Sequence, residues 1–173
     1  SNRMKDMKGS AIREIFKVAA DPSYISLAGG NPAPELFPAH ELAAIAAELL
    51  EKQPVRALQY GVTEGYPELR EQVKERLARV ERIGTAEDEV LIVSGGQQGI
   101  DLTTKNLINE GDTVIVEEPS FIGALNAFRS FGAHLAGVAM DDEGMRPDVL
   151  ERVIAENPGA KLIYTIPTFQ NPM

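Results

Sequence analysis

The second half of this chain alternates short, almost wholly apolar runs with helical patterns, and this alternation constrains the fold most. The apolar runs cover residues 89–93, 113–116, 134–138 and 162–166. A continuous apolar run of this length is typical of a strand buried on both faces, as in a parallel sheet. Helical patterns separate the runs, at residues 97–109, 121–131 and 147–156. We therefore expect an α/β fold with a mostly parallel sheet flanked by helices.

Glycine and proline residues mark where these helices begin or end. Gly111 is expected to cap the first helix, and Gly132 to stop the second. Pro147 stands at the first position of the third helix, where its missing N–H has no helical partner to lose. Residues 141–144 are expected to form a turn before that helix.

The first half of the chain mixes helices with loops. Helical patterns cover residues 6–20, 41–51 and 67–80, whereas residues 59–65 are too rich in glycine for regular structure. We expect residues 1–38 to form an arm of helix and loop, and residues 39–173 to form an incomplete large domain. It is expected to be incomplete because no helix follows the last strand to cover it.

Composition excludes several classes of function. The formal net charge is −9, so the chain is expected to repel nucleic-acid backbones. It has no cysteine, which excludes disulfides and thiol catalysis and is compatible with the cytoplasm. With only two histidines, His40 and His134, a histidine-rich metal site is not expected. No apolar run approaches the roughly 18–20 residues that a membrane span needs.

Three loops that follow expected strands carry groups suited to one kind of ligand. Gly96 and Gln97 open a helix, where unpaired amides and a partial positive charge favour phosphate. Phe121 offers an aromatic face to a flat ring, and Asn171 offers a neutral amide. Ligands of open α/β sheets bind beyond the carboxyl ends of the strands. Together the three loops suit a flat, phosphorylated heteroaromatic cofactor.

Each loop also has a purely structural interpretation. Gly96 could belong to an ordinary turn between strand and helix, and Phe121 could be the first core residue of its helix. Asn171 precedes a proline, as turn asparagines often do. The functional interpretation depends on the three occurring together.

Five ordered segments resemble those of class I/II aminotransferases, the fold-type I enzymes that use pyridoxal 5'-phosphate (PLP). The segments are residues 27–38 (LAGGNPAPELFP), 58–70, 94–99 (SGGQQG), 118–121 (EPSF) and 171–172. Within that family the chain is similar to the branch that includes aminoadipate and kynurenine aminotransferases. The resemblance implies an aspartate aminotransferase-like large domain, of which residues 39–173 would be the N-terminal part.

The resemblance also implies roles for individual residues. Gly96 and Gln97 would hold the cofactor phosphate, and Phe121 would stack on the pyridine ring. Asn171 would donate a hydrogen bond to the ring oxygen of the cofactor. Tyr60 would reach the phosphate of the partner subunit across a dimer interface.

Two further residues would lie on the substrate side. Gly30 would lie beside the substrate carboxylate, and Arg13 resembles an arginine of the mobile N-terminal segment in that branch. In such enzymes a lysine bonds covalently to the cofactor, an acid holds the pyridine nitrogen protonated and an arginine binds the substrate carboxylate. All three would follow the asparagine loop, and no lysine here fits the motif, so the chain alone is expected to be an inactive N-terminal portion.

The activity implied for the parent protein is transfer of an amino group from an amino acid to a 2-oxo acid. The parent is expected to be a cytoplasmic homodimer with no nucleic-acid or membrane partner. Two other functions share these segments: a PLP-dependent carbon–sulfur lyase, and the aminotransferase-like sensor domain of a transcription regulator. An assay of keto-acid production with and without an acceptor keto acid would distinguish the lyase from an aminotransferase. A DNA-binding domain upstream would indicate the transcription regulator.

Overall fold

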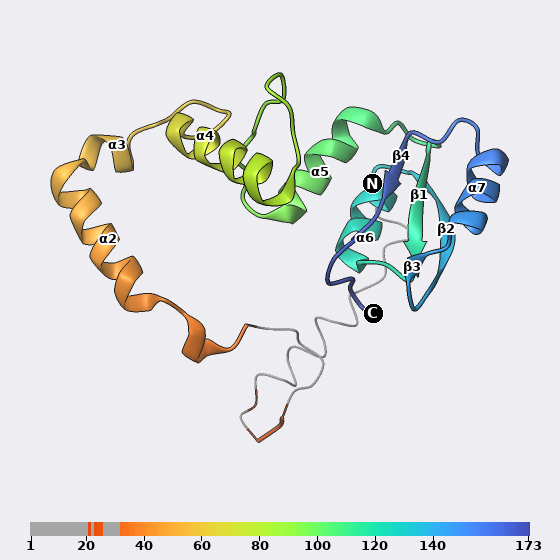
Figure 1. Cartoon of the computed structure of the whole chain (residues 1–173), viewed down its shortest axis with the longest axis horizontal. Coiled ribbons are helices and arrows are strands. Elements are labelled where there is room, and N and C mark those ends of the chain that lie inside the picture. The colour runs from red at the N-terminus through yellow and green to blue at the C-terminus, as the bar shows by residue number, and fades with distance from the viewer. Residues whose placement is uncertain (1–20, 22, 26–31) are drawn as a thin grey trace. The chain divides into compact units, whose positions relative to one another are not determined.

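The computed structural model describes residues 21, 23–25 and 32–173. They fall into two compact units, one ending at Ile92 and the other running from Val93 to Met173 (Figure 1). The helix predicted at residues 6–20 lies outside the described residues. The predicted boundary at residue 38 stays a prediction.

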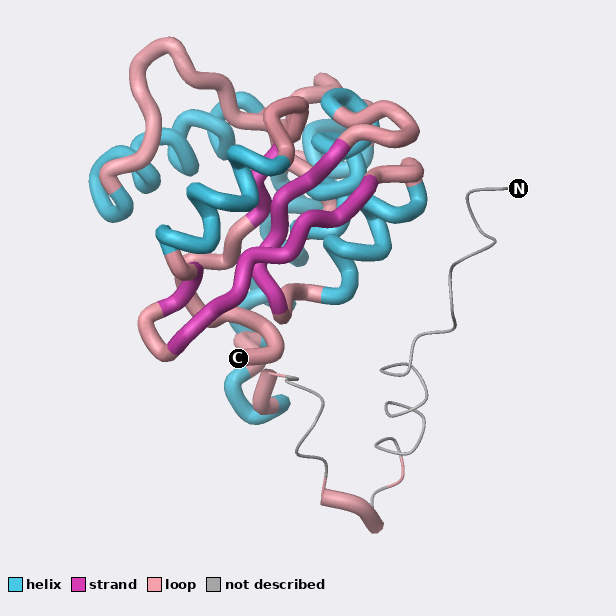
Figure 2. The backbone as a smooth tube through the Cα atoms, turned by 90° about the vertical axis from the view of Figure 1, so that its right-hand side faces the viewer, coloured by secondary structure: helices cyan, strands magenta, loops and turns pink. Residues whose placement is uncertain are grey.

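The unit from Val93 onward is built on a four-stranded sheet of order β3–β2–β1–β4. The strands are β1 (Thr113–Glu118), β2 (His134–Asp141), β3 (Gly144–Met145) and β4 (Leu162–Tyr164). β1 pairs in parallel with β2 and β4, and β3 pairs antiparallel with β2. The mostly parallel sheet flanked by helices is confirmed (Figure 2). The predicted turn at residues 141–144 closes the β2–β3 hairpin.

Both faces of β1 are buried, which explains its uninterrupted apolar sequence. The helices of this unit are α5 (Gly96–Leu107), α6 (Ile122–Ser130) and α7 (Pro147–Glu156). Val114 and Val116 belong to one buried cluster with residues of α6, whereas Ile115 belongs to another with residues of α7. Successive residues of a strand point to opposite faces, so these two clusters lie on opposite sides of the sheet.

The strand predicted at residues 89–93 is wrong. The structure assigns no strand there, and Leu91 is 53% exposed. A strand exists only where a neighbouring strand supplies hydrogen bonds. Instead, the N–H of Ile92 bonds to the carbonyl of Glu64 at 2.9 Å, and the guanidinium of Arg70 donates to the carbonyl of Val90. Within the described part of the chain, this apolar run therefore pairs with a loop and a side chain.

The first helix of this unit ends earlier than its sequence suggested. α5 stops at Leu107, and its C-cap is Ile108 in an extended conformation. Gly111, predicted as the cap, lies in the following turn with φ of +91° and bonds through its N–H to the carbonyl of Gly132. Ile108 is only 6% exposed, whereas Leu107 is 51% exposed. The chain leaves the helix early because Ile108 then enters the core.

The unit that ends at Ile92 is helical. Its elements are η2 (Pro34–Leu36), α2 (Ala39–Lys52), α3 (Pro54–Leu58), α4 (Pro67–Arg76) and the π-helical η3 (Leu77–Glu81). The helices predicted at residues 41–51 and 67–80 are therefore confirmed. Arg70 on α4 also pairs with Glu89 at 2.6 Å, which fixes the end of this unit against α4. Among the described residues, no helix is long and apolar enough to cross a bilayer.

Candidate functional site

The N-terminus of α5 presents unpaired backbone amides to open space. Its N-cap, Gly95, has φ of +83°, and no side chain caps the helix. In the described part of the chain, the N–H groups of Gly96 and Gln97 have no protein acceptor, whereas the Ser94 N–H bonds to the Gln98 side chain. A Cβ placed on Gly95 or Gly96 would meet nothing within 4 Å. Unpaired amides facing open space are what an anion needs.

Gln97 and Phe121 are brought together at the start of α6. The side-chain amide of Gln97 donates to the carbonyl of Gly123 at 3.2 Å. A Cβ on Gly123 would lie 2.5 Å from the Phe121 ring and 2.6 Å from Oε1 of Gln97. Only glycine fits between these two side chains, so the two predicted cofactor contacts are neighbours.

Phe121 is also a core residue. It is the N-cap of α6 and packs, half-buried, against the cluster that contains Val116 and Phe128. The structural interpretation of Phe121 is therefore confirmed, whereas its predicted contact with a cofactor ring stays a prediction.

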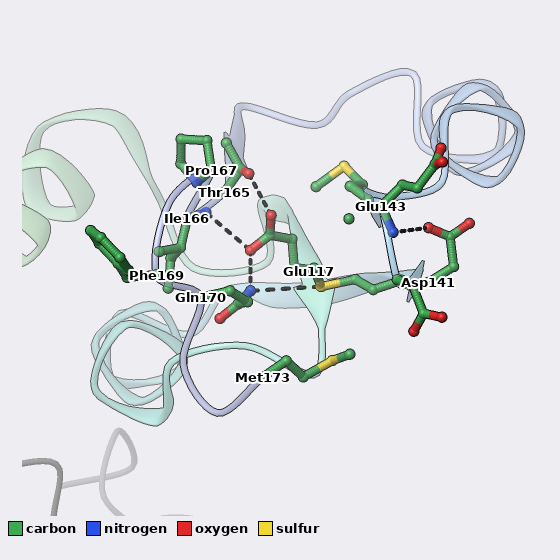
Figure 3. A pocket seen from close by; sticks show the side chains of 13 residues that line it. Glu117, Asp141, Glu143, Thr165, Ile166, Pro167, Phe169, Gln170 and Met173 are labelled. Carbon is green, nitrogen blue, oxygen red and sulfur yellow. Dashed lines mark hydrogen bonds between the residues drawn. The ribbon is translucent and has the colours of Figure 1, made fainter. Parts of the chain in front are cut away.

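Asn171 lies in the segment that follows β4 and is exposed. The residue before it, Gln170, is tied to β1 through Glu117, as Figure 3 shows. Glu117 is 3% exposed and accepts three hydrogen bonds, from the Thr165 hydroxyl at 2.5 Å, the Ile166 N–H at 3.0 Å and the Gln170 amide. This network attaches the asparagine segment to the carboxyl end of the sheet.

The charge of Glu117 also acts on Tyr164, the last residue of β4. Burial, and then the neighbouring Glu117 carboxylate, raise the pKa of Tyr164 above its ordinary value of 10.0. Its ring packs edge-on against Phe128, with centroids 5.5 Å apart. The phenol of Tyr164 therefore loses its proton at a higher pH than an exposed tyrosine does.

A cavity of about 570 Å³ lies beside this network, between the β2–β3 hairpin and the segment after β4 (Figure 3). Its lining includes four carboxylates, those of Glu117, Asp141, Asp142 and Glu143. Neither Gln97 nor Phe121 lines it. Negative walls disfavour a phosphate, so the amides of α5 fit a phosphorylated cofactor better than this cavity does.

Three further residues, Tyr60, Gly30 and Arg13, were predicted to take part in the site. Tyr60 belongs to the helical unit and is 99% exposed. Gly30 and Arg13 lie outside the described residues. Their roles stay predictions. Among the described residues, no group of three or more histidine, cysteine or acidic side chains could hold a metal ion.

Sequence reasoning gave no role to Glu117, Thr165 or Gln170. The available signal was a carboxylate that directly follows the apolar run 113–116 on the sheet edge predicted to bind ligand. Its partners are 48 to 53 residues away along the chain, so only the fold reveals them.

A model of the family "Aminotransferase class I and II" matches residues 22–173. The chain belongs to this family. Among curated relatives of this aminotransferase-family chain, aromatic-amino-acid aminotransferase 1 of Thermococcus litoralis is 41% identical over 99% of the chain. The 2-aminoadipate transaminase of Thermus thermophilus is 44% identical over 96% of it. The chain spans only 42% and 40% of these two proteins.

Solved structures agree with the fold and the cofactor. The kynurenine aminotransferase of Pyrococcus horikoshii, solved in complex with PMP, superposes with a TM-score of 0.89 at 39% identity. That match covers 99% of this chain and 43% of the other. The aminotransferase-like fold and pyridoxal phosphate as the family's cofactor are thereby confirmed. The chain is also 32% identical, over 93% of its length, to an uncharacterized HTH-type transcriptional regulator, YdfD of Bacillus subtilis, and spans 33% of that protein.

Proposed function

We propose that this chain is the cofactor-holding N-terminal portion of a PLP-dependent aminotransferase, which moves an amino group from an amino acid to a 2-oxo acid. The observation that carries the proposal is the juxtaposition of the uncapped α5 N-terminus, Gln97 and the Phe121 ring around Gly123. When bound, PLP supplies an electron sink for chemistry at the amino-acid α-carbon. In this proposal Gly96 and Gln97 bind the phosphate, Phe121 orients the ring and Asn171 donates to its oxygen.

The same proposal extends to the partner subunit and the substrates. Tyr60, with a side chain that is 99% exposed, is free to reach a second copy, as expected of a homodimer. Substrate contacts are assigned to Gly30 and Arg13. Because no lysine of the chain fits the family motif, the chain alone is proposed to be inactive, and activity is assigned to the longer protein.

Pyridoxamine 5'-phosphate is the probe that tests cofactor binding, because its amine cannot condense with surface lysines as an aldehyde can. We expect the chain to bind it, and to bind phosphate-free pyridoxamine much more weakly, in calorimetric titrations. Gly96→Pro removes one amide donor at the helix position that tolerates proline best. It should weaken binding by about 10- to 100-fold, the value of one hydrogen bond to a charged group.

Gly99→Ala is the matched control on the same helix. Its Cβ would make only ordinary contact with the Val93 side chain at 3.8 Å, and its N–H already bonds to the carbonyl of Gly95, so affinity should stay close to that of the unmodified chain. Equal affinity for the phosphorylated and phosphate-free probes would contradict the proposal.

A further inference from the structure

A buried carboxylate continues the connection between β1 and β4 beyond the end of their backbone ladder. The last backbone pair of the ladder joins Val116 to Tyr164. Glu117, the next residue of β1, is 3% exposed. A buried ionisable side chain is costly unless its oxygens accept hydrogen bonds, so the partners of Glu117 indicate what its burial achieves.

All three hydrogen-bond donors to Glu117 come from the segment that follows β4. The hydroxyl of Thr165 donates to Oε1, and the N–H of Ile166 and the amide of Gln170 donate to Oε2 (Figure 3). Each donor is neutral, so these bonds depend on precise geometry more than on charge pairing. The carboxylate therefore fixes both ends of segment 165–170 to β1.

The other acidic side chains of the adjoining cavity behave differently. Asp141, Asp142 and Glu143 are exposed, and Asp141 accepts a hydrogen bond from the N–H of Glu143 within its own turn. Among the cavity's acidic residues, Glu117 is the buried one, and its hydrogen bonds go to segment 165–170, outside its own strand. Its partners therefore point to a role in placing that element.

We propose that Glu117 is a positioning residue that holds segment 165–170 so that Asn171 is presented at the carboxyl end of the sheet. Gln170, which Glu117 binds, directly precedes Asn171. β1, which carries Glu117, leads into Phe121. The Glu117 carboxylate thus fixes the position of Asn171 relative to the Phe121 ring. What Asn171 then contacts rests on the proposed function, whereas the anchoring itself does not.

Two substitutions of Glu117 separate hydrogen bonding from charge. In Glu117→Gln the amide oxygen can still accept from Ile166 and Gln170, and its NH2 can donate to the Thr165 hydroxyl, which also accepts. Glu117→Leu keeps a similar shape but removes the acceptor of three part-buried hydrogen bonds. If Glu117 positions the segment, the glutamine variant should keep segment 165–170 in place, whereas the leucine variant should loosen it.

Amide hydrogen exchange in the full chain measures the anchoring directly. Ile166 reports on the segment, and Ile115, in the β1 ladder, is the internal reference. We expect Glu117→Leu to accelerate Ile166 exchange by about tenfold or more relative to Ile115, and Glu117→Gln by less than about threefold. Glu118→Leu, which removes the exposed neighbouring carboxylate, should leave the ratio unchanged.

Unchanged exchange at Ile166 in Glu117→Leu, or equal acceleration at Ile115 and Ile166, would overturn the proposal. If the leucine variant does not fold, Thr165→Val gives the same comparison, because it removes the donor to Oε1 and keeps the side-chain shape. We expect it to raise the Ile166 rate relative to Ile115, and no rise overturns the proposal.

Titration with pyridoxamine 5'-phosphate then connects the anchoring to the cofactor. Glu117→Leu should bind the probe more weakly than Glu117→Gln. If the unmodified chain does not bind the probe while the exchange pattern holds, the proposed function fails and the anchoring role stands. If the probe binds equally to both variants despite a loosened segment, positioning toward the cofactor is overturned.

Discussion

Among single residues, Tyr164 gives the structure a testable pH dependence. Its pKa is raised in the folded chain, first by burial and then by Glu117. A folded pKa above the unfolded one contributes stability that is complete below pH 10.0 and is lost as the pH rises through the raised value. Tyr164→Phe removes this ionisation, so its free energy of unfolding should fall less than that of the unmodified chain between about pH 9 and pH 11.

Urea unfolding at a series of pH values measures this difference. Tyr60→Phe is the control, because a side chain that is 99% exposed should not couple its ionisation to folding. Identical high-pH slopes for Tyr164→Phe and the unmodified chain would show that the phenol ionises without opposing the fold.

The residue scale also shows what a sequence can and cannot predict about a site. Gly96, Gln97 and Phe121 could be placed near one another because each starts a helix after an expected strand, and the structure joins Gln97 and Phe121 at Gly123. The bond between Glu117 and Gln170 could not be predicted, since it joins residues 53 positions apart. Local patterns indicate which residues reach an edge, whereas side-chain partners depend on the packed fold.

At the scale of elements, the start of α6 is the most tightly constrained place in the candidate site. A methyl group on Gly123 would collide with both Phe121 and Gln97. Gly123→Ala should therefore displace one of them and lower the free energy of unfolding by about 1–3 kcal/mol, as overpacking commonly does. Gly159→Ala, where a Cβ meets nothing within 4 Å, should change it by less than about 0.5 kcal/mol. Equal unfolding midpoints in denaturant titrations of the two variants would contradict this packing.

The same scale explains why the longer elements were predictable and why one predicted strand does not form. β1 is apolar because both its faces are covered and its two neighbours supply hydrogen bonds. Residues 89–93 have an equally apolar sequence but no strand beside them within the described chain. An apolar sequence indicates that burial of the segment is favourable. A strand forms there only if a neighbouring strand supplies hydrogen bonds.

At the scale of the whole molecule, the chain carries an apolar face that its own described residues leave exposed. On α2 the side chains of Leu42, Ile45, Leu49 and Leu50 are between 41% and 59% exposed. All four lie in the helix predicted at residues 41–51, and an apolar stripe of this kind normally packs against another element. The chain spans 42% of its Thermococcus litoralis relative, and that relative has further residues outside the matched part.

We therefore expect the isolated chain to associate through this face of α2, with a mass by light scattering that rises with concentration. Replacing Leu42 and Leu49 together by glutamine removes apolar area without changing charge, and should lower the association constant by about tenfold or more. Replacing Glu41 and Glu51 on the same helix by glutamine is the control, and it should leave association intact because no apolar area is lost. A mass that stays constant with concentration, or that both double variants change equally, would show that this face is not the one that pairs.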